Sequence, residues 1–432
     1  MSHTPHTRRG FLHLLATGAV SSSFLARAES VEAALAEALR PGRFAADDAA
    51  SVRALSGQYL LAPGLNYLNH ASIGTVPRPV HDAHVAYLEL CESHPSLYVW
   101  GRVWRDVTEQ TRSAAAQLVG CADDDLAITH NTTEGFNVLA HGLPLQPGDE
   151  VLFSSLNHAG ASVPWRRLAG TRGFTVRQFD FPVERGAELD EAEVVALHLD
   201  ALSPRTRVLV FPHVDNMIGL RHPVRRLTEA ARARGVEFVA VDGAQSAGMI
   251  PLRLEESGVD AYSMSPHKWI QSPKGTGILF VRGTLRPHLP PMWFRSGGDG
   301  PGPSARAYED YGTRAWPAVV ALGDAVAFQA SLGEAEKVRR YRGLWRRILE
   351  RVDAEPGLTW HSPREWELGS MIVSVGVRGR SAPQLATSLL EEHGINVRAF
   401  GPPLNALRLS PNVSTTDEEL DRALDVLAAA AG

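Results

Sequence analysis

The chain has 432 residues, 44% of them hydrophobic and 21% charged, which predicts a globular protein with one large core or two moderate ones. Its formal net charge of -5 and the lack of a Lys/Arg-rich block with interleaved aromatics argue against nucleic acid as a partner. The two cysteines, Cys91 and Cys121, stand in no metal-ligand or redox spacing, so we expect neither a disulfide framework nor a metal site.

The N-terminal segment, residues 1–28, has the pattern of a twin-arginine export signal. Arg8-Arg9-Gly10-Phe11-Leu12 precedes a weakly apolar run that ends at Leu25, and Ala26-Arg27-Ala28 supplies an Ala-x-Ala cleavage site before Glu29. The run is too short and too polar for stable membrane insertion. We therefore expect export by the twin-arginine machinery and a periplasmic or secreted mature protein. The alternative is an amphipathic start that is merely frayed.

Residues 29–64 are predicted to form a helical arm, and residues 65–315 a large domain in which short apolar runs alternate with helix-length stretches. The runs are continuous rather than alternating, which is typical of strands buried on both faces. We expect an α/β domain with a mostly parallel, seven-stranded sheet. The expected helices before the sheet lie at 78–92 and 102–118, and the expected strands at 127–129, 150–153, 175–176, 207–211, 236–241, 261–264 and 277–281.

Residues directly after each predicted strand are candidate site residues, because ligands bind at the carboxyl ends of strands in such sheets. Thr132 and Thr133, followed by Glu134, stand at a predicted helix N-terminus, where amides and hydroxyls suit a phosphate. An ordinary capping box is the alternative there. His158 follows the next strand, and its ring could stack on a cofactor or be a satisfied polar group.

Two later strand ends carry an amide and a carboxylate. Asn216 could donate to a phenolate oxygen, or could be a turn residue before Gly219. Asp242, if buried beside a pyridine nitrogen, would keep that nitrogen protonated and make the ring an electron sink. A helix N-cap is the alternative for Asp242. Gln245, one turn further on, could approach the phenolic oxygen from the same side.

Lys268 lies in the polar cluster Ser265-Pro266-His267-Lys268-Trp269, directly after the apolar run that ends at Met264. Desolvation in a pocket at a strand end favours the free amine over the ammonium. A free amine can form a Schiff base with the aldehyde of pyridoxal 5'-phosphate. A solvated lysine is the alternative, but the polar groups at the preceding strand ends converge on Lys268 and favour the Schiff base.

Residues 316–432 are predicted to form a smaller α+β domain that closes over the substrate. Its expected helices lie at 317–331, at 334–353, from Ala382, and after a capping-box pattern at 415–418, and its expected strands at 370–377 and 396–400. Arg408 stands between two leucines, which disfavours a surface position, and its planar guanidinium suits a carboxylate.

With these motifs the chain resembles the class V aminotransferase family of fold type I pyridoxal phosphate enzymes, in its isopenicillin N epimerase-like branch related to cysteine desulfurases. The resemblance runs from about Tyr67 to the C-terminus and rests most on residues 241–245, 265–269 and 273–277. It implies an internal aldimine on Lys268.

The resemblance also implies roles for the other candidate residues. Asp242 would pair with the pyridine nitrogen, and Arg408 would bind the substrate α-carboxylate. The phosphate would be held by Thr132, Thr133, Ser265 and His267, and the ring would be contacted by His158, Asn216 and Gln245. A homodimer is implied, in which the loop with Gly312 and Thr313 reaches the partner's phosphate.

One departure from the related desulfurases concerns the loop before Arg408. Residues 397–407 contain no cysteine, which disfavours a desulfurase that forms a persulfide. We therefore expect an enzyme that acts at Cα of an amino acid or a peptide-like metabolite, with Lys268 removing the Cα proton, as an epimerase or aminotransferase. The alternatives are a C-S lyase without a cysteine nucleophile and a catalytically idle periplasmic binding protein of the same fold.

Overall fold

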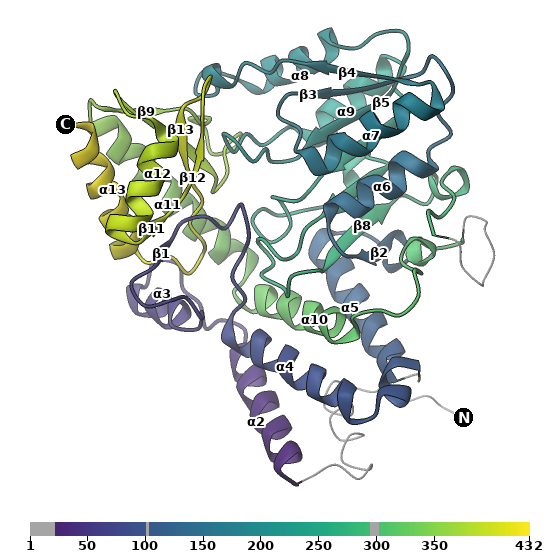
Figure 1. The fold of residues 1–432 in the computed structure, drawn as a ribbon, viewed down its shortest axis with the longest axis vertical. Helices are drawn as coiled ribbons and strands as arrows, with labels where there is room; N and C mark the ends of the chain where they lie inside the picture. Colours follow the sequence, from purple (N-terminus) through teal and green to yellow (C-terminus); the bar gives the residue numbers. More distant parts are fainter. Residues whose placement is uncertain (1–21, 101–102, 294–301) are drawn as a thin grey trace.

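The computed structural model describes residues 22–100, 103–293 and 302–432, which form an α/β body with a large sheet and, beside it, a smaller C-terminal sheet (Figure 1). The twin-arginine motif lies outside the described residues. The predicted cleavage site at Ala28 lies within helix α2 (Ser22–Ala38), so helical structure begins earlier than the predicted arm. The rest of the arm contains one short helix, α3 (Ala49–Ser56).

The large sheet has seven strands in the order β2-β8-β7-β6-β5-β3-β4. β8 is antiparallel to both of its neighbours, and the other strand pairs are parallel, so the predicted mostly parallel α/β architecture is confirmed. The strands are β2 (Leu126–Thr129), β3 (Glu150–Ser154), β4 (Thr175–Phe179), β5 (Thr206–Pro212), β6 (Phe238–Asp242), β7 (Ala261–Met264) and β8 (Gly277–Val281).

Two hydrophobic cores lie on opposite faces of this sheet, because successive side chains of a strand point to opposite sides. In β5, Leu209 belongs to one core and Val210 to the other. One core includes side chains of α6 (Thr132–Gly142) and α7 (Ala159–Arg172). The other includes side chains of α5 (Val103–Val119), α9 (Val224–Ala233) and α10 (Trp316–Ser331). Burial on both faces explains why these strands are continuous apolar runs in the sequence.

Helices α4 (Arg78–Ser93), α5 (Val103–Val119) and α10 (Trp316–Ser331) pack together beneath the sheet in Figure 1. α10 begins at the predicted boundary between the two domains but packs on α4 and α5. Two further helices, α8 (Glu191–Asp200) and α9 (Val224–Ala233), join strands of the sheet. No single described helix is long and apolar enough to cross a membrane; the pair α10 and α11, bent by 75°, would qualify by length and composition only.

The C-terminal sheet is antiparallel, with strand order β12-β13-β10-β9, and carries helices α11, α12 and α13. The predicted strand at 396–400 is divided in two, because β11 pairs in parallel with β1 while β12 joins the antiparallel sheet. The elements are β1 (Asn66–Tyr67), β9 (Leu358–Trp360), β10 (Val373–Val377), β11 (Ile395–Asn396), β12 (Arg398–Phe400), β13 (Ala406–Leu409), α11 (Glu334–Ala354), α12 (Ala382–His393) and α13 (Asp417–Ala431).

The capping box of α13 is shifted by one residue from the predicted pattern. Thr416 caps the helix and accepts from the Glu419 amide, while the Glu419 carboxylate accepts from the Thr416 amide. The Thr415 hydroxyl instead accepts from the Asn412 amide, which ties down the loop before the helix. The prediction at 415–418 was therefore wrong in register, although the helix itself is confirmed.

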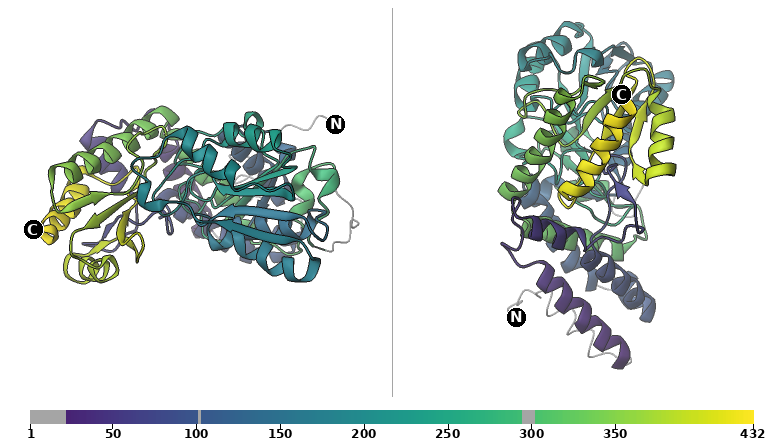
Figure 2. Two further views of the ribbon diagram at one scale, coloured as in Figure 1. Left: turned by 90° about the horizontal axis from the view of Figure 1, so that it is seen from above. Right: turned by 90° about the vertical axis from the view of Figure 1, so that its left-hand side faces the viewer.

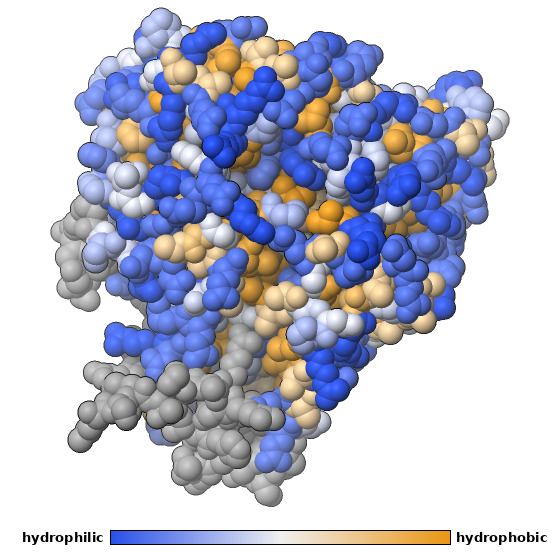
Figure 3. Space-filling view, turned by 180° about the vertical axis from the view of Figure 1, so that it is seen from behind, coloured by the Kyte–Doolittle hydropathy of each residue, from blue (hydrophilic) through white to orange (hydrophobic). Residues whose placement is uncertain are grey.

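The pairing of β1 with β11 attaches the N-terminal segment to the C-terminal part of the chain. Figure 2 shows the two sheets side by side and α2 projecting away from both. The rear face is mainly hydrophilic, with hydrophobic residues interspersed (Figure 3). Residues just after β1 can therefore contact side chains of both sheets.

Candidate active site

The predicted catalytic residues gather at the carboxyl edge of the large sheet. Asp242 is the last residue of β6, and Lys268 follows β7. The charge of Asp242 shifts the pKa of both Lys268 and His158. The charge of Arg408, a residue of β13 (Ala406–Leu409) in the other sheet, shifts the same two pKa values. These four side chains therefore form one electrostatic cluster, assembled from both halves of the molecule.

The Lys268 amine is desolvated at the centre of this cluster. Burial lowers the pKa of Lys268 to about 8, the charge of Asp242 opposes that shift, and the charge of Arg408 adds to it. The backbone around it is held closely, because a Cβ on Gly74 would lie 1.9 Å from the Lys268 carbonyl oxygen. The Gly74 amide donates to the His267 carbonyl at 3.0 Å. A large fraction of the amine is therefore neutral near pH 8, as nucleophilic attack requires.

Asp242 is 4% exposed, and burial raises the pKa of its carboxyl, while the Ala244 amide and the charges of Lys268 and His158 oppose the shift. One carboxylate oxygen accepts from the Ala244 amide at 2.9 Å. A turn rather than a helix follows Asp242, so the helix N-cap interpretation is wrong. A buried carboxylate with one internal donor among the described residues is suited to a cationic partner.

Gln245 is held by two internal hydrogen bonds. Its amide group donates to the Ala71 carbonyl at 2.8 Å and accepts from the Trp269 indole at 2.8 Å. These bonds join the turn after β6 to the segments before Gly74 and after Lys268. The Gln245 amide has a second N–H, which is left for the predicted contact with a phenolic oxygen.

Hydroxyl groups gather at the N-terminus of α6. The Ser265 hydroxyl lies 2.8 Å from the Thr132 hydroxyl and accepts from the Thr132 amide at 3.3 Å. Thr133 faces Gly160, where a Cβ would lie 2.5 Å from the Thr133 hydroxyl oxygen. The buried Nδ1 of His267 has no hydrogen-bond partner among the described residues. A helix N-terminus with neighbouring hydroxyls and an unsatisfied ring nitrogen fits a phosphate group.

The cap of α6 differs from the predicted Thr-Thr-Glu box. Asn131 is the N-cap and accepts from the Glu134 amide at 3.0 Å. The Glu134 carboxylate accepts from the His130 amide at 2.6 Å and contacts the His130 ring at 2.8 Å. Because Asn131 caps the helix, the Thr132 and Thr133 hydroxyls are not used as caps.

His158 is an exposed residue at the start of α7. Its Nδ1 accepts from the Gly160 amide at 3.1 Å, which caps the helix. Partial desolvation lowers the pKa of His158, the charge of Asp242 opposes that shift, and the charges of Lys268 and Arg408 add to it. The His158 ring is therefore accessible and electrostatically coupled to Lys268 and Asp242, and its predicted stacking on a cofactor stays a prediction.

Arg408 is 2% exposed, and burial, together with the charge of Arg398, lowers its pKa to about 10. Its guanidinium donates to the Asn216 carbonyl at 2.8 Å, to the Asn69 side-chain oxygen at 2.9 Å and to the Ser72 hydroxyl at 2.6 Å. No described carboxylate lies within ion-pair distance of Arg408. The group is therefore oriented by neutral oxygens, and its charge is left for a ligand.

Asn69, Ser72 and Asp215 were not predicted as site residues. Asp215 is fully buried and accepts from the amides of Met217, Ile218 and Leu220, which shapes the turn that presents the Asn216 carbonyl to Arg408. Burial raises the pKa of Asp215 to about 6. The polar, turn-rich stretch after residue 69 was the one available signal. The contacts of Asn69, Ser72 and Asn216 with Arg408 join residues that are 339, 336 and 192 positions apart in the sequence, and no local pattern predicts them.

Thr313 lies apart from this cluster. It is exposed, in the loop between η6 (Ala305–Tyr308) and α10. The next residue is anchored, because Arg314 donates to the Ile128 carbonyl at 2.8 Å and to Glu309 at 3.1 Å. The predicted contact of Thr313 with a partner's phosphate stays a prediction.

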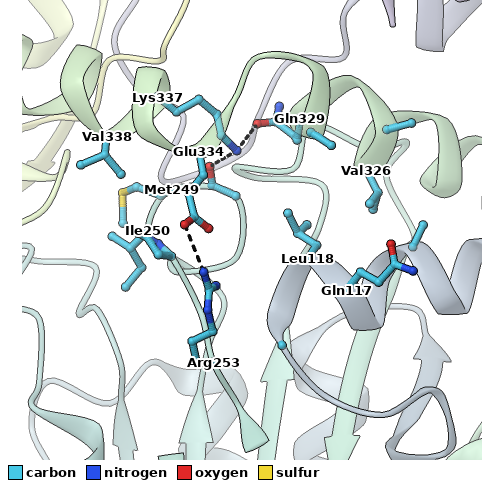
Figure 4. Close-up of a pocket in the computed structure, with 16 residues that line it drawn as sticks. Gln117, Leu118, Met249, Ile250, Arg253, Val326, Gln329, Glu334, Lys337 and Val338 are labelled. Atoms are coloured by element: carbon cyan, nitrogen blue, oxygen red, sulfur yellow. Dashed lines mark hydrogen bonds and ion pairs between the residues drawn. The ribbon is translucent and has the colours of Figure 1, made fainter. Parts of the chain in front are cut away.

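A separate cavity of about 540 Å³ lies between α5, the corner of α10 and α11, and residues 248–253 (Figure 4). Lys337 reaches into it and donates to Gln329 at 3.2 Å, and Arg253 pairs with Glu334 at 3.3 Å. The Gly248 backbone packs against the backbone of Trp269, since a Cβ on Gly248 would lie 2.6 Å from the Trp269 carbonyl oxygen.

Within the described parts of the chain, no cluster of three or more His, Cys, Asp or Glu side chains could hold a metal ion.

Known proteins resemble this chain in sequence and in fold. The model of the family described as aminotransferase class-V matches residues 66–422. The isopenicillin N epimerase of Streptomyces clavuligerus is 33% identical over 87% of this chain and 97% of that protein. A cysteine desulfurase of Pectobacterium atrosepticum is 27% identical over 83% of this chain and 91% of that protein. The structure of a cysteine desulfurase from Thermococcus onnurineus superposes with a TM-score of 0.76 and 23% identity, covering 88% of this chain and 97% of that one.

Proposed function

The chain belongs to the class V aminotransferase family of pyridoxal phosphate-dependent enzymes, and from this premise we propose that it acts at Cα of an amino acid or a peptide-like metabolite, as an epimerase or aminotransferase. One observation carries the proposal. A desolvated amine, a buried carboxylate and a guanidinium without an acidic partner lie in one cluster, on Lys268, Asp242 and Arg408. These are the groups that chemistry on an α-amino acid needs.

The residues present fit pyridoxal 5'-phosphate. The hydroxyls of Thr132 and Ser265 at the α6 N-terminus, with the unsatisfied His267 ring, would hold its phosphate. Asp242, buried and with a single internal donor, would pair with its ring nitrogen. Lys268 would carry it covalently. When bound, the group supplies an electron sink for negative charge at the substrate Cα.

The side chains of this protein then supply orientation and proton transfer. Arg408 binds the substrate carboxylate with a guanidinium already aimed by Asn69, Ser72 and the Asn216 carbonyl. Lys268, with a pKa near 8, takes or returns a proton at Cα close to physiological pH. Preorganised donors need no rearrangement when the substrate arrives, which lowers the barrier.

The cysteines support an epimerase or aminotransferase over a persulfide-forming desulfurase. Cys91 is buried in α4, and Cys121 follows α5. Burial and neighbouring carboxylates raise the pKa of Cys121 to about 12, so this thiol is a poor nucleophile. A cysteine-independent C-S lyase is the second candidate, because elimination needs the same lysine and no thiol. Release of pyruvate and ammonia from cystine would identify it.

The test is hydrogen exchange at Cα in D₂O. Loss of the α-proton signal of L-amino acids should depend on Lys268 and vanish in Lys268→Ala. Lys337→Ala is the matched control, because burial also lowers the pKa of Lys337 to about 8 outside the site. Borohydride reduction followed by peptide mapping should place a pyridoxyl group on Lys268. Exchange that survives in Lys268→Ala, or a label on another lysine, would refute the proposal.

We also propose that the protein is a homodimer and is exported by the twin-arginine pathway. The exposure of Thr313, which leaves this residue accessible to a partner chain, supports the first. The Arg8-Arg9 motif and the Ala-x-Ala site support the second. Light scattering of the purified protein tests the dimer. Replacing both arginines by lysine should retain the protein in the cytoplasm, and unchanged export would contradict the signal assignment.

A further inference from the structure

A second arginine stands directly across from Arg408 in the C-terminal sheet. β12 and β13 are antiparallel, and their register pairs Arg398 with Arg408. Residues directly opposite in an antiparallel pair project from the same face of the sheet, with Cβ atoms about 4.5–5.5 Å apart. Arg398 is exposed, whereas Arg408 is buried. The Arg408 side chain is therefore buried in the site, and the Arg398 side chain projects from the same face of the sheet at the exposed edge of the site.

The two positive charges lack an acidic partner among the residues that the structure describes. No described carboxylate lies within ion-pair distance of Arg398 or Arg408. Asp215 is the acid whose charge is felt by Arg408, but its oxygens accept from three backbone amides. After burial, the charge of Arg398 is the largest cause that lowers the pKa of Arg408. Like charges directly opposite each other in a sheet repel, so an anionic ligand between Arg398 and Arg408 would remove an unfavourable interaction.

An apolar surface lies beside the two arginines. Phe400 is two residues from Arg398 and so projects from the same face of β12. The Arg408 guanidinium lies 5.8 Å from the centre of the Phe400 ring. Ile73, next to the Arg408 ligand Ser72, is 43% exposed. The entrance thus offers hydrocarbon contact together with the outer positive charge.

We propose that the substrate is an amino acid whose side chain carries a second carboxylate, bound by Arg398 at the mouth of the site. The α-carboxylate lies on Arg408, the hydrocarbon part of the side chain lies along Phe400, and the distal carboxylate reaches Arg398. This assignment rests on the proposed function, since it takes Arg408 as the α-carboxylate site. It narrows the substrate class to dicarboxylic amino acids and to derivatives whose side chain ends in a carboxylate.

Binding of acids without an amino group tests this assignment independently of turnover. Glutarate and adipate are compared with pentanoate and hexanoate, respectively, by calorimetry on the protein loaded with pyridoxal 5'-phosphate. The dicarboxylates should bind at least tenfold more tightly than the monocarboxylates of equal length. Arg398→Gln should remove that advantage and leave monocarboxylate affinity within twofold, and Arg398→Lys should restore part of it, because the charge is kept without the fork geometry.

Arg380→Gln is the control, because Arg380 is likewise exposed but lies in the turn after β10. Its affinities should equal those of the unaltered protein. Equal binding of both classes of acid, or an unchanged preference in Arg398→Gln, would overturn the second carboxylate site. The proposed function has a different refuting result: no amino acid loses its α-proton in D₂O. A protein that exchanges monocarboxylic amino acids as well as L-glutamate or L-2-aminoadipate keeps the proposed function and loses this inference.

Discussion

Replacing Arg408 by methionine should weaken substrate binding strongly while leaving the fold intact. The guanidinium donates to three neutral oxygens, on Asn69, Ser72 and Asn216, and no described acid pairs with it. Its burial is therefore costly, and the desolvation penalty of a buried charge offsets the hydrogen bonds that it makes. We expect the free energy of unfolding of Arg408→Met to lie within about 1 kcal/mol of the unaltered protein.

The loss in catalysis should be much larger. A buried, charge-assisted contact to a carboxylate is worth about 2–5 kcal/mol when one partner is removed. This range corresponds to a decrease in kcat/KM of roughly 30- to 5,000-fold, since about 1.4 kcal/mol is a factor of ten. The measurement is α-proton exchange in D₂O as a function of substrate concentration, together with urea unfolding of the same samples. The decrease should appear for the α-amino acid and be smaller for its amide.

Arg112 provides the matched control. It is 1% exposed but pairs with the buried carboxylate of Glu309 at 2.6 Å. Arg112→Met should lower the free energy of unfolding by about 3 kcal/mol, near the low end for broken buried pairs because Arg314 still contacts Glu309. The reasoning would be refuted if Arg408→Met were destabilised as much as Arg112→Met, or if its kcat/KM fell less than tenfold.

Three further predictions concern the cofactor site. The rate of pyridoxal 5'-phosphate uptake by cofactor-free protein should reach half of its maximum near pH 8 and level off about one pH unit higher, because deprotonation creates the nucleophilic amine of Lys268. A rise that continues to about pH 10 without levelling off would contradict the lowered pKa of Lys268. Ser265→Ala should weaken cofactor affinity about tenfold through loss of a charge-assisted hydrogen bond, measured by equilibrium dialysis, and an unchanged affinity would exclude Ser265 as a phosphate ligand. Gly74→Ala should lower the free energy of unfolding by about 2 to 3 kcal/mol, the usual cost of overpacking, and should displace Lys268. The reason is that the new Cβ would lie 1.9 Å from the Lys268 carbonyl oxygen. An unaltered cofactor spectrum and melting temperature would show instead that the segment shifts without cost.

Local patterns were sufficient for the large sheet and for the residues at its edge. Strands buried on both faces leave continuous apolar runs, and their carboxyl ends must meet, so Asp242 and Lys268 could be placed together before any coordinates. Helix signals were reliable as well, since α4, α5, α10 and α11 begin and end within a residue or two of the predicted bounds. Cap assignments were less reliable, as the shift to Thr416 and Asn131 shows, because neighbouring Ser, Thr and Asn compete for the same amides.

The sequence by itself determined the fold class, the placement of Asp242 and Lys268 at the ends of neighbouring strands, and the absence of a thiol before Arg408. Tertiary structure alone decided what surrounds Arg408. Asn69, Ser72 and Asn216 reach it across separations of 339, 336 and 192 residues, and Arg398 faces it only because β12 pairs with β13 in one register. Such contacts depend on how the chain folds back on itself, and the physical reason they were missed is that periodicity and spacing report only neighbours within one element.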